Sequence, residues 1–180
     1  MSGNCYLVPM AGFCAECNED ADCPNGGCQA DPVAGEAFCT DGGLGTMCQS
    51  DAACTGDLVC GELFDAKGFV EASYCGYCKS DADCPAGRIC APHYEEGGVG
   101  GYNTCVDPGT VPNDQGCPVD GNGQGNDAAC ASGICSVADA FGLGIYVGAC
   151  GECTTNADCG GGTCVSASAT LMGVKGSKCQ

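Results

Sequence analysis

Cysteine is the residue type with the most chemical potential in this chain, occurring 22 times in 180 residues. Three Cys-x-x-Cys steps have the spacing used by thiol redox catalysts and by zinc sites. They are Cys14/Cys17, Cys75/Cys78 and Cys150/Cys153. A redox motif opens a helix beside a βαβ pattern, which this sequence lacks. A structural zinc site joins two close pairs, whereas these pairs lie about 60 to 75 residues apart. We therefore expect these cysteines to form disulfides.

A Gly-rich loop carries the candidate metal ligands, because oxygen-bearing side chains stand at every second position there. These residues are Asp120, Asn122, Gln124, Asn126 and the adjacent Asp127. Such alternation allows a loop to curl its oxygens around a hard cation, as in extracellular calcium repeats. Ala131 stands where an EF-hand would have its terminal Glu. We expect weak calcium binding, with a Kd of roughly 0.1–1 mM, at this loop.

Acidic pairs recur ahead of several cysteines and allow two interpretations. Asp20/Asp22 and Asp81/Asp83 could add calcium ligands. Alternatively, Asp at these positions favours turns and helix starts without any metal. The single histidine, His93, lies in a Gly-rich stretch with no nucleophile beside it. Because no hydrolase, phosphate-loop or dinucleotide motif occurs either, we expect no enzymatic activity.

The cysteines follow one repeating grid, which predicts the architecture. Each unit reads Cys, five residues, Cys, four or five residues, Cys, ten to fourteen residues, Cys, and one unit has a longer first gap. The last two cysteines of a sixth unit, Cys5 and Cys14, precede the five full copies. The full units are Cys17, Cys23, Cys28, Cys39; Cys48, Cys54, Cys60, Cys75; Cys78, Cys84, Cys90, Cys105; Cys117, Cys130, Cys135, Cys150; and Cys153, Cys159, Cys164, Cys179.

We predict that the first cysteine of each unit bonds the third and the second bonds the fourth. In the clearest unit these bridges are Cys78–Cys90 and Cys84–Cys105. Cys5 and Cys14 would then bond each other. Because sequence alone does not determine connectivity, other pairings stay open.

Units alternate between two types, so that the larger repeat is a pair with eight cysteines. Odd units end their first gap in Ala-Asp-Cys, and even units end it in Ala-Ala-Cys. The expected modules are 1–42, which lacks its first half-unit, 43–110 and 111–180. Short hairpins are expected at 63–70, 93–102 and 141–147, where Gly-containing turns separate β-rich runs. One-turn helices are expected over 80–83 and 155–158, and a linker around Pro108 and Pro112.

The predicted fold class is therefore a small, disulfide-rich, mostly β chain of tandem repeat modules in an elongated array. The Cys-x-x-Asp-x-Asp-Cys-x(4,5)-Cys pattern resembles small extracellular cysteine-rich repeats, namely Dickkopf N-terminal domains, EB modules and whey-acidic-protein-like domains. The adjacent Cys-Cys pair of the whey acidic group is absent here. The resemblance implies a class, secreted disulfide-rich β modules, and no particular activity.

Composition limits both compartment and partners. Disulfides persist in oxidising environments, so we expect an extracellular protein. Five Lys and Arg against 23 Asp and Glu give a net charge of −18, which argues against nucleic acid and anionic membranes and favours divalent cations. No apolar run approaches the ~20 residues of a membrane helix.

Repetition without a distinctive site favours a structural role, as a subunit of a fibre, matrix or surface layer. Such a chain would self-associate head-to-tail, with calcium or other divalent cations reducing the repulsion between copies. The alternative is a secreted monomeric binding or inhibitory module that acts through its hairpin tips.

The grid predicts that all 22 cysteines are oxidised in eleven disulfides. Reduction should therefore raise the intact mass by two hydrogen masses for each of eleven bridges. Before reduction, a thiol-blocking reagent should add nothing to the protein. Several cysteines that react without reduction would contradict the prediction.

Overall fold

The computed structural model describes residues 4–8, 11–31, 34–67, 72–95, 100–140, 142–170 and 172–180, and only the backbone of 4–8 and 11–14. Within these residues the chain forms short antiparallel hairpins and single 3-10 turns, with no longer helix. The strands are β1 Asn4–Val8, β2 Ala11–Ala15, β3 Cys28–Asp31, β4 Glu36–Cys39, β5 Val59–Glu62, β6 Ser73–Gly76, β7 Ile89–Tyr94, β8 Gly101–Val106, β9 Cys135–Ala140, β10 Ile145–Cys150, β11 Cys164–Val165, β12 Ser168–Thr170, β13 Gly173–Lys175 and β14 Lys178–Cys179. The 3-10 turns are η1 Asp20–Asp22, η2 Asp51–Ala53, η3 Asp81–Asp83, η4 Asp127–Ala129 and η5 Asn156–Cys159.

Each full unit consists of a 3-10 turn before its second cysteine and a hairpin between its third and fourth cysteines. Consecutive strands pair in every unit except the last, where β11 pairs with β14 and encloses the hairpin β12–β13. The third and fourth cysteines face each other across each hairpin, as Cys90 faces Cys105. In the N-terminal half-unit, Cys5 faces Cys14 in the same register.

Two disulfides close every full unit, first cysteine to third and second to fourth, which is the expected pairing. Their Cα atoms are 5.4–6.0 Å apart, within the normal range for a disulfide. The side chains of Cys5 and Cys14 lie outside the described residues, so the eleventh bridge stays a prediction. The ten described bridges are Cys17–Cys28, Cys23–Cys39, Cys48–Cys60, Cys54–Cys75, Cys78–Cys90, Cys84–Cys105, Cys117–Cys135, Cys130–Cys150, Cys153–Cys164 and Cys159–Cys179.

One side-chain hydrogen bond recurs in all five full units and holds the 3-10 turn against the hairpin. The first acidic or amide residue of the turn accepts the backbone N–H of the third cysteine. In the third full unit this is Asp81 Oδ1 accepting from Cys90 N at 2.8 Å. The other pairs are Asp20–Cys28, Asp51–Cys60, Asp127–Cys135 and Asn156–Cys164, at 2.7–3.0 Å.

The alternation between Ala-Asp-Cys and Ala-Ala-Cys has a packing cause. In odd units the second Asp, such as Asp83, is exposed. In even units the incoming chain covers the turn, so Ala53 and Ala129 are only 3% and 0% exposed. Gly42 of the incoming chain has φ +72°, and a Cβ there would lie 2.1 Å from the Ala53 carbonyl oxygen. A carboxylate in place of Ala53 or Ala129 would therefore be buried, which costs free energy.

Even and odd units are joined in pairs by a second repeated contact. The residue before the first cysteine of each odd unit donates its N–H to the residue two places before the fourth cysteine. These bonds are Glu16 N to Ala37 O, Tyr77 N to Asn103 O and Glu152 N to Ser177 O, all 2.8 Å. The half-unit β1–β2 therefore packs against the first odd unit in the same way that β5–β6 and β9–β10 pack against the odd units that follow them.

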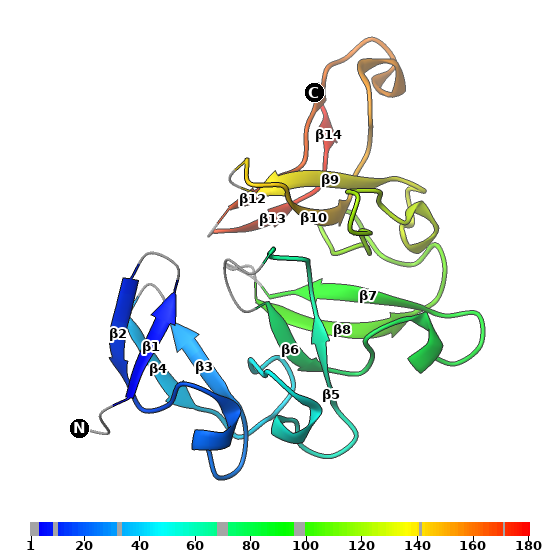
Figure 1. Cartoon of the computed structure of the whole chain (residues 1–180). Coiled ribbons are helices and arrows are strands. Elements are labelled where there is room, and N and C mark those ends of the chain that lie inside the picture. The colour runs from blue at the N-terminus through cyan, green and yellow to red at the C-terminus, as the bar shows by residue number, and fades with distance from the viewer. Residues whose placement is uncertain are drawn as a thin grey trace.

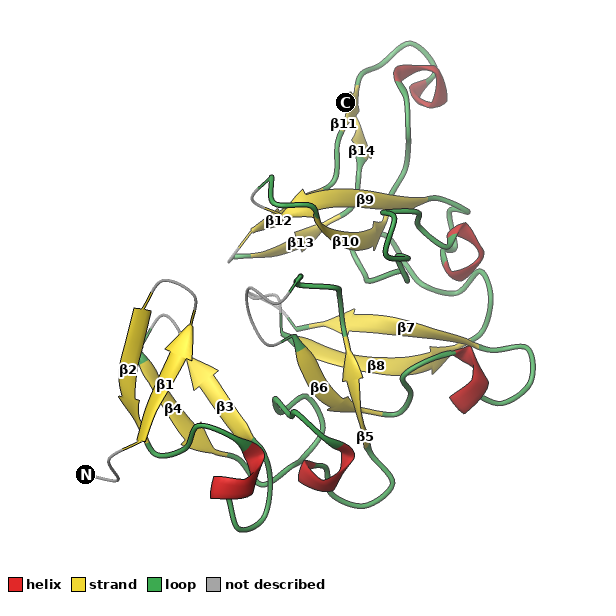
Figure 2. Ribbon diagram, in the orientation of Figure 1, coloured by secondary structure: helices red, strands yellow, loops and turns green. Residues whose placement is uncertain are grey.

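The paired units follow an open arc, with β1–β4 at one end, β5–β8 in the middle and β9–β14 at the other end (Figure 1). The 3-10 turns lie along its outer side (Figure 2). Apolar packing is divided into small clusters, of which one spans four units. That cluster contains Phe64, Tyr94, Ala140, Ile145, Val147, Ala169 and Val174. The second and third modules therefore share a core.

Two expectations about local structure need correction. The strands begin at the third cysteine of a unit or one residue before it, so residues 63–67 belong to the connection between β5 and β6. Residues 68–70 of the hairpin expected at 63–70 lie outside the described residues. The segment around Pro108 and Pro112 is no loose linker. Val111 is 6% exposed, and its N–H and carbonyl bond to Ala129 and Ala131 of the next unit. The expected one-turn helices are present as η3 and η5.

Replacing Asp81 with Ala should remove the acceptor for Cys90 N–H and speed exchange of that amide by about tenfold or more, because the loss of one hydrogen bond costs about 1–3 kcal/mol. Asp81→Asn should preserve protection, since Asn156 has this role in the last full unit. Amide exchange by NMR measures both, with Asp57→Ala as an exposed acidic control. Equal protection in Asp81→Ala and Asp81→Asn would contradict the structural role.

Candidate functional sites

Groups of three cysteine sulfurs lie within 4.8 Å of one another in each full unit, a spacing that could hold a metal. Every sulfur in these groups belongs to a disulfide, so none is the thiolate that a metal requires. Likewise, the two cysteines of a Cys-x-x-Cys step belong to different disulfides. Cys75 bonds Cys54, and Cys78 bonds Cys90. These cysteines are structural in the described part of the chain.

The repeated Asp pairs act on the backbone. The first Asp accepts the N–H of the third cysteine, as described above. The second Asp of each odd unit accepts two N–H groups at the start of its 3-10 turn. Asp158 Oδ2 accepts from Thr154 N and Thr155 N at 2.8 and 2.7 Å. Asp22 and Asp83 make equivalent pairs of bonds. The turn-and-helix-start interpretation accounts for these contacts without a metal.

The loop at 120–127 forms a miniature hairpin, with Val119 bridged to Gly125. Asp120 Oδ1 accepts from Asn122 N and Gln124 N at 2.9 and 2.8 Å. The hydrogen bond from Gln124 N is the main reason that the pKa of Asp120 is lowered. The structure thus gathers Asp120, Asn122 and Gln124 in one turn.

The other two predicted ligands of that loop point to backbone groups of the next turn and strand. Asn126 Oδ1 accepts from Ala128 N at 3.1 Å, and Asp127 Oδ1 accepts from Cys135 N at 2.7 Å. Asp127 holds the position of Asp81 in the repeat. The alternating oxygen-bearing residues therefore do not all face one point. Asp120, Asn122 and Gln124 share a turn, whereas Asp127 makes a hydrogen bond that supports the fold.

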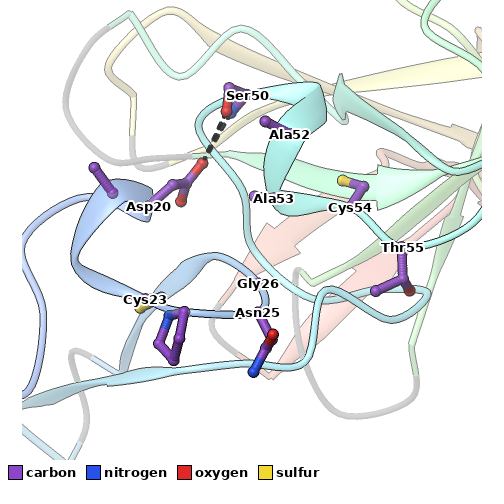
Figure 3. Close-up of a pocket in the computed structure, with 11 residues that line it drawn as sticks. Asp20, Cys23, Asn25, Gly26, Ser50, Ala52, Ala53, Cys54 and Thr55 are labelled. Carbon is purple, nitrogen blue, oxygen red and sulfur yellow. Dashed lines mark hydrogen bonds between the residues drawn. The ribbon is translucent and has the colours of Figure 1, made fainter.

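A cleft of about 490 Å³ lies between the first and second modules, where η1 approaches η2 (Figure 3). The one acidic side chain in its lining, Asp20, accepts hydrogen bonds from both modules. Asp20 Oδ2 accepts from Gln49 N and Ser50 N at 2.7 and 2.9 Å, while Oδ1 accepts from Cys28 N. This carboxylate holds the first module against the second, so the residues of the cleft form a structural contact between modules.

A cavity of about 340 Å³ lies between the second and third modules, and His93 contributes to its wall. The imidazole packs against Tyr102, with ring centroids 4.9 Å apart. The remaining wall is formed by Ala91, Pro92, Thr104, Val106, Thr110, Val111, Pro112, Gln115 and Gly116. It holds no carboxylate or cysteine that could pair with the histidine in acid–base or nucleophilic catalysis.

Some of the few basic side chains form ion pairs and others do not. Three exposed ion pairs occur among the described residues, Lys67–Asp65, Lys79–Asp51 and Arg88–Asp107. The hydrogen bond from Lys79 is the main cause of the lowered pKa of Asp51. Exposed pairs of this kind contribute little to stability. Lys175 and Lys178, in the last unit, take part in no ion pair in the described structure.

Sequence reasoning missed two kinds of contact that join units. Glu16 and Glu152, each directly before the first cysteine of an odd unit, accept the N–H of the fourth cysteine, Cys39 or Cys179. The two glutamates hold the same position in the cysteine repeat, and this repetition is the sequence signal that could have revealed their shared role. Ser136 and Ser177 hydrogen-bond each other at 2.5 Å in a buried site between units, and no repeat marks that pair.

No protein-family model matches this chain, and no curated protein or solved structure is significantly similar to it. Among the described residues, no helix is long and apolar enough to cross a membrane.

Hydrogen bonds from Thr154 and Thr155 lower the pKa of Asp158 from 3.8 to about 2. A depressed carboxyl pKa stabilises the fold above the unfolded value and loses that effect as pH falls through the folded value. The Thr154 and Thr155 amides should therefore lose protection from exchange between about pH 4 and pH 2.

In Asp158→Asn the same two amides should show no such pH step, because the amide side chain does not titrate. NMR exchange measurements, corrected for intrinsic rates, give the profile. The Cys164 amide is an internal control, since its acceptor is the non-titrating Asn156. A step of equal size in Asp158→Asn would disprove the assignment.

Proposed function

We propose that the protein is an extracellular structural subunit of a disulfide-stabilised fibre, matrix or surface assembly, with no enzymatic activity. The observation that supports this most is the sameness of the units. All five full units repeat two disulfides and one turn-to-hairpin hydrogen bond. No unit is distinguished by a convergent set of catalytic groups in the described residues. A fold of this kind is suited to persisting in an oxidising environment.

The alternative function is a secreted monomeric binding or inhibitory module that acts through its hairpin tips. One observation favours it. Leu143 and Met172, at the tips of β9–β10 and β12–β13, are 49% and 82% exposed. Exposed apolar side chains at loop tips are suited to docking on a partner. The two functions differ in whether the purified protein associates with itself.

Calcium and other divalent cations belong to the proposal as promoters of assembly. A net charge of −18 makes copies repel one another, and bound cations would reduce that repulsion. At the 120–127 loop, Asp120, Asn122 and Gln124 offer oxygen donors of the type that calcium prefers. Asn126 fits less well, because its one side-chain oxygen accepts from Ala128 N. Asp127 uses one carboxylate oxygen for Cys135 N, as Asp120 does for Asn122 N and Gln124 N.

Electron microscopy of the oxidised full-length protein should show filaments or sheets, more abundant with millimolar calcium than with chelator. Deleting residues 1–14, which removes both Cys5 and Cys14, should abolish assembly if the half-unit makes the contact between copies. The deleted chain should keep its ten other disulfides, measured by peptide mapping. Monodisperse full-length protein at high concentration with calcium would favour the binding-module alternative instead.

A further inference from the structure

The chain contains two Asn-Gly steps, Asn25-Gly26 and Asn122-Gly123. An asparagine next to a glycine can react with its own backbone, because the following residue has no Cβ to hinder the approach of its nitrogen to the side-chain amide. The residue types at the two steps are identical. Any difference between their reactivities in the native protein therefore comes from the surrounding structure.

The turn that contains Gly26 lacks a backbone hydrogen bond that closes its counterparts. Three full units have four residues between their second and third cysteines. In two of them the third of these residues donates its N–H to the second cysteine, as Gly133 N to Cys130 O and Gly162 N to Cys159 O, both 3.0 Å. Gly26 holds this position in the first full unit, and its N–H makes no hydrogen bond in the described part of the chain. The Gly26 nitrogen is therefore available for another reaction.

The side chain of Asn25 is also unconstrained. Asn25 is exposed, and its amide makes no hydrogen bond to any residue that the structure describes. It lies in the lining of the cleft between the first and second modules, where its side chain extends away from Asp20 (Figure 3). No contact of the amide has to break before its carbon meets the Gly26 nitrogen.

The second Asn-Gly step is held by Asp120. Asn122 donates its backbone N–H to Asp120 Oδ1 at 2.9 Å and its side-chain Nδ2 to Asp120 Oδ2 at 3.4 Å. Gly123 donates its N–H to the Asp120 carbonyl oxygen at 3.0 Å. Both the nitrogen that would attack and the amide that would be attacked are therefore engaged at this step.

We propose that Asn25 is a site of self-modification, in which the Gly26 nitrogen attacks the side-chain amide of Asn25. The bond from Gly26 N to Asn25 Cγ forms, the Cγ–Nδ2 bond breaks, and the Gly26 amide proton leaves with Nδ2 as ammonia. Water then opens the cyclic imide at either of its carbonyl groups, which leaves aspartate or isoaspartate at position 25. Neither step is an oxidation or a reduction. The inference does not depend on the proposed structural function.

The isoaspartate product would disturb the backbone around it, because it lengthens the main chain by one carbon between positions 25 and 26. Space there is small, since a Cβ on Gly26 would lie 2.1 Å from the Thr40 carbonyl oxygen. The next residue, Gly27, accepts hydrogen bonds from Thr40 N at 2.9 Å and Thr40 Oγ1 at 3.1 Å. We expect these bonds to weaken in the modified protein.

Ageing of the oxidised full-length protein in ¹⁸O-labelled water tests the site directly. Opening of the imide places one ¹⁸O atom in the product, whereas any reaction during later digestion in ordinary water adds none. A protease that cuts after Glu releases residues 20–36, in which Asn25 is the only Asn. Mass spectrometry should find label at position 25 accumulating about tenfold or more faster than at Asn122, because the hydrogen bonds around Asn122 must break first.

The unfolded chain supplies the reference rate. In reduced, denatured protein the two Asn-Gly steps should react at similar rates, so the ratio of unfolded to native rate measures protection by the fold. Protection should be small at Asn25 and about tenfold or more at Asn122. Equal protection at the two steps would overturn the proposal. So would a native Asn25 that stays intact while the same residue reacts in the unfolded chain.

Two variants test the effect of the modification on the fold. Asn25→Asp adds the negative charge without lengthening the main chain, so the Thr40 amide should keep its protection from hydrogen exchange. Isoaspartate-containing protein, separated from aged wild type by chromatography, should exchange this amide about tenfold or more faster. Aged Asn25→Ser should keep its protection, because position 25 no longer reacts. Loss of Thr40 protection in aged Asn25→Ser would overturn the assignment to Asn25.

Discussion

The crossed pair of disulfides in each unit is the constraint on which the rest of this structure depends. Leu, Ile, Val and Phe are too few to supply a single large core, and the buried residues divide into small clusters that contain mostly Ala and Cys. A bridge closing a loop of about 15 residues contributes roughly 3 kcal/mol by restricting the unfolded chain. The ten described bridges close separations of 11 to 21 residues.

Once the bridges define a unit, carboxylates organise its backbone. A unit this small leaves many N–H groups without helix or sheet partners, and buried N–H groups must be satisfied. Short Asp side chains reach them from the turn, as Asp81 reaches Cys90 and Asp83 reaches Ser80. Part of the high negative charge is therefore structural. Ionised acceptors also make stronger hydrogen bonds than neutral ones.

Units are then assembled by repeated contacts of two kinds. Within a pair, the N–H before each odd unit bonds the neighbouring hairpin. Between pairs, the incoming chain covers the 3-10 turn of the even unit and meets the odd hairpin before it. Each unit thus contacts mainly its neighbours in the chain, which is the character of a repeat protein. The cluster around Val147 is the exception, because it joins four units. A modular chain of this kind extends by adding neighbours, which is why a structural role agrees with its architecture.

The candidate site shows how far sequence patterns can be taken. The oxygen alternation from Asp120 to Asp127 predicted one metal loop. The structure gives Asp127 the repeat's own role at Cys135, and only Asp120, Asn122 and Gln124 share a turn. Asp127 occupies the same position in the cysteine repeat as Asp81, and that alignment predicts its hydrogen bond to the third cysteine of the unit. The pattern alone could not show it, because a carboxylate that binds a backbone N–H and one that binds a cation have the same residue type.

By itself the sequence determined the unit, because cysteine spacing limits which sulfurs can meet and turn residues mark where the chain reverses. The hairpins between third and fourth cysteines and the one-turn helices follow from local spacing, whereas the pairing of the cysteines was one of several that the spacing left open. Only the tertiary structure decided how units lie against one another. The burial of Val111, the need for Ala at 53 and 129 and the contact between modules at Asp20 arise between segments whose approach no local pattern encodes. Contacts within a unit are short-range and covalently limited, whereas contacts between units depend on the shapes that the finished units present to each other.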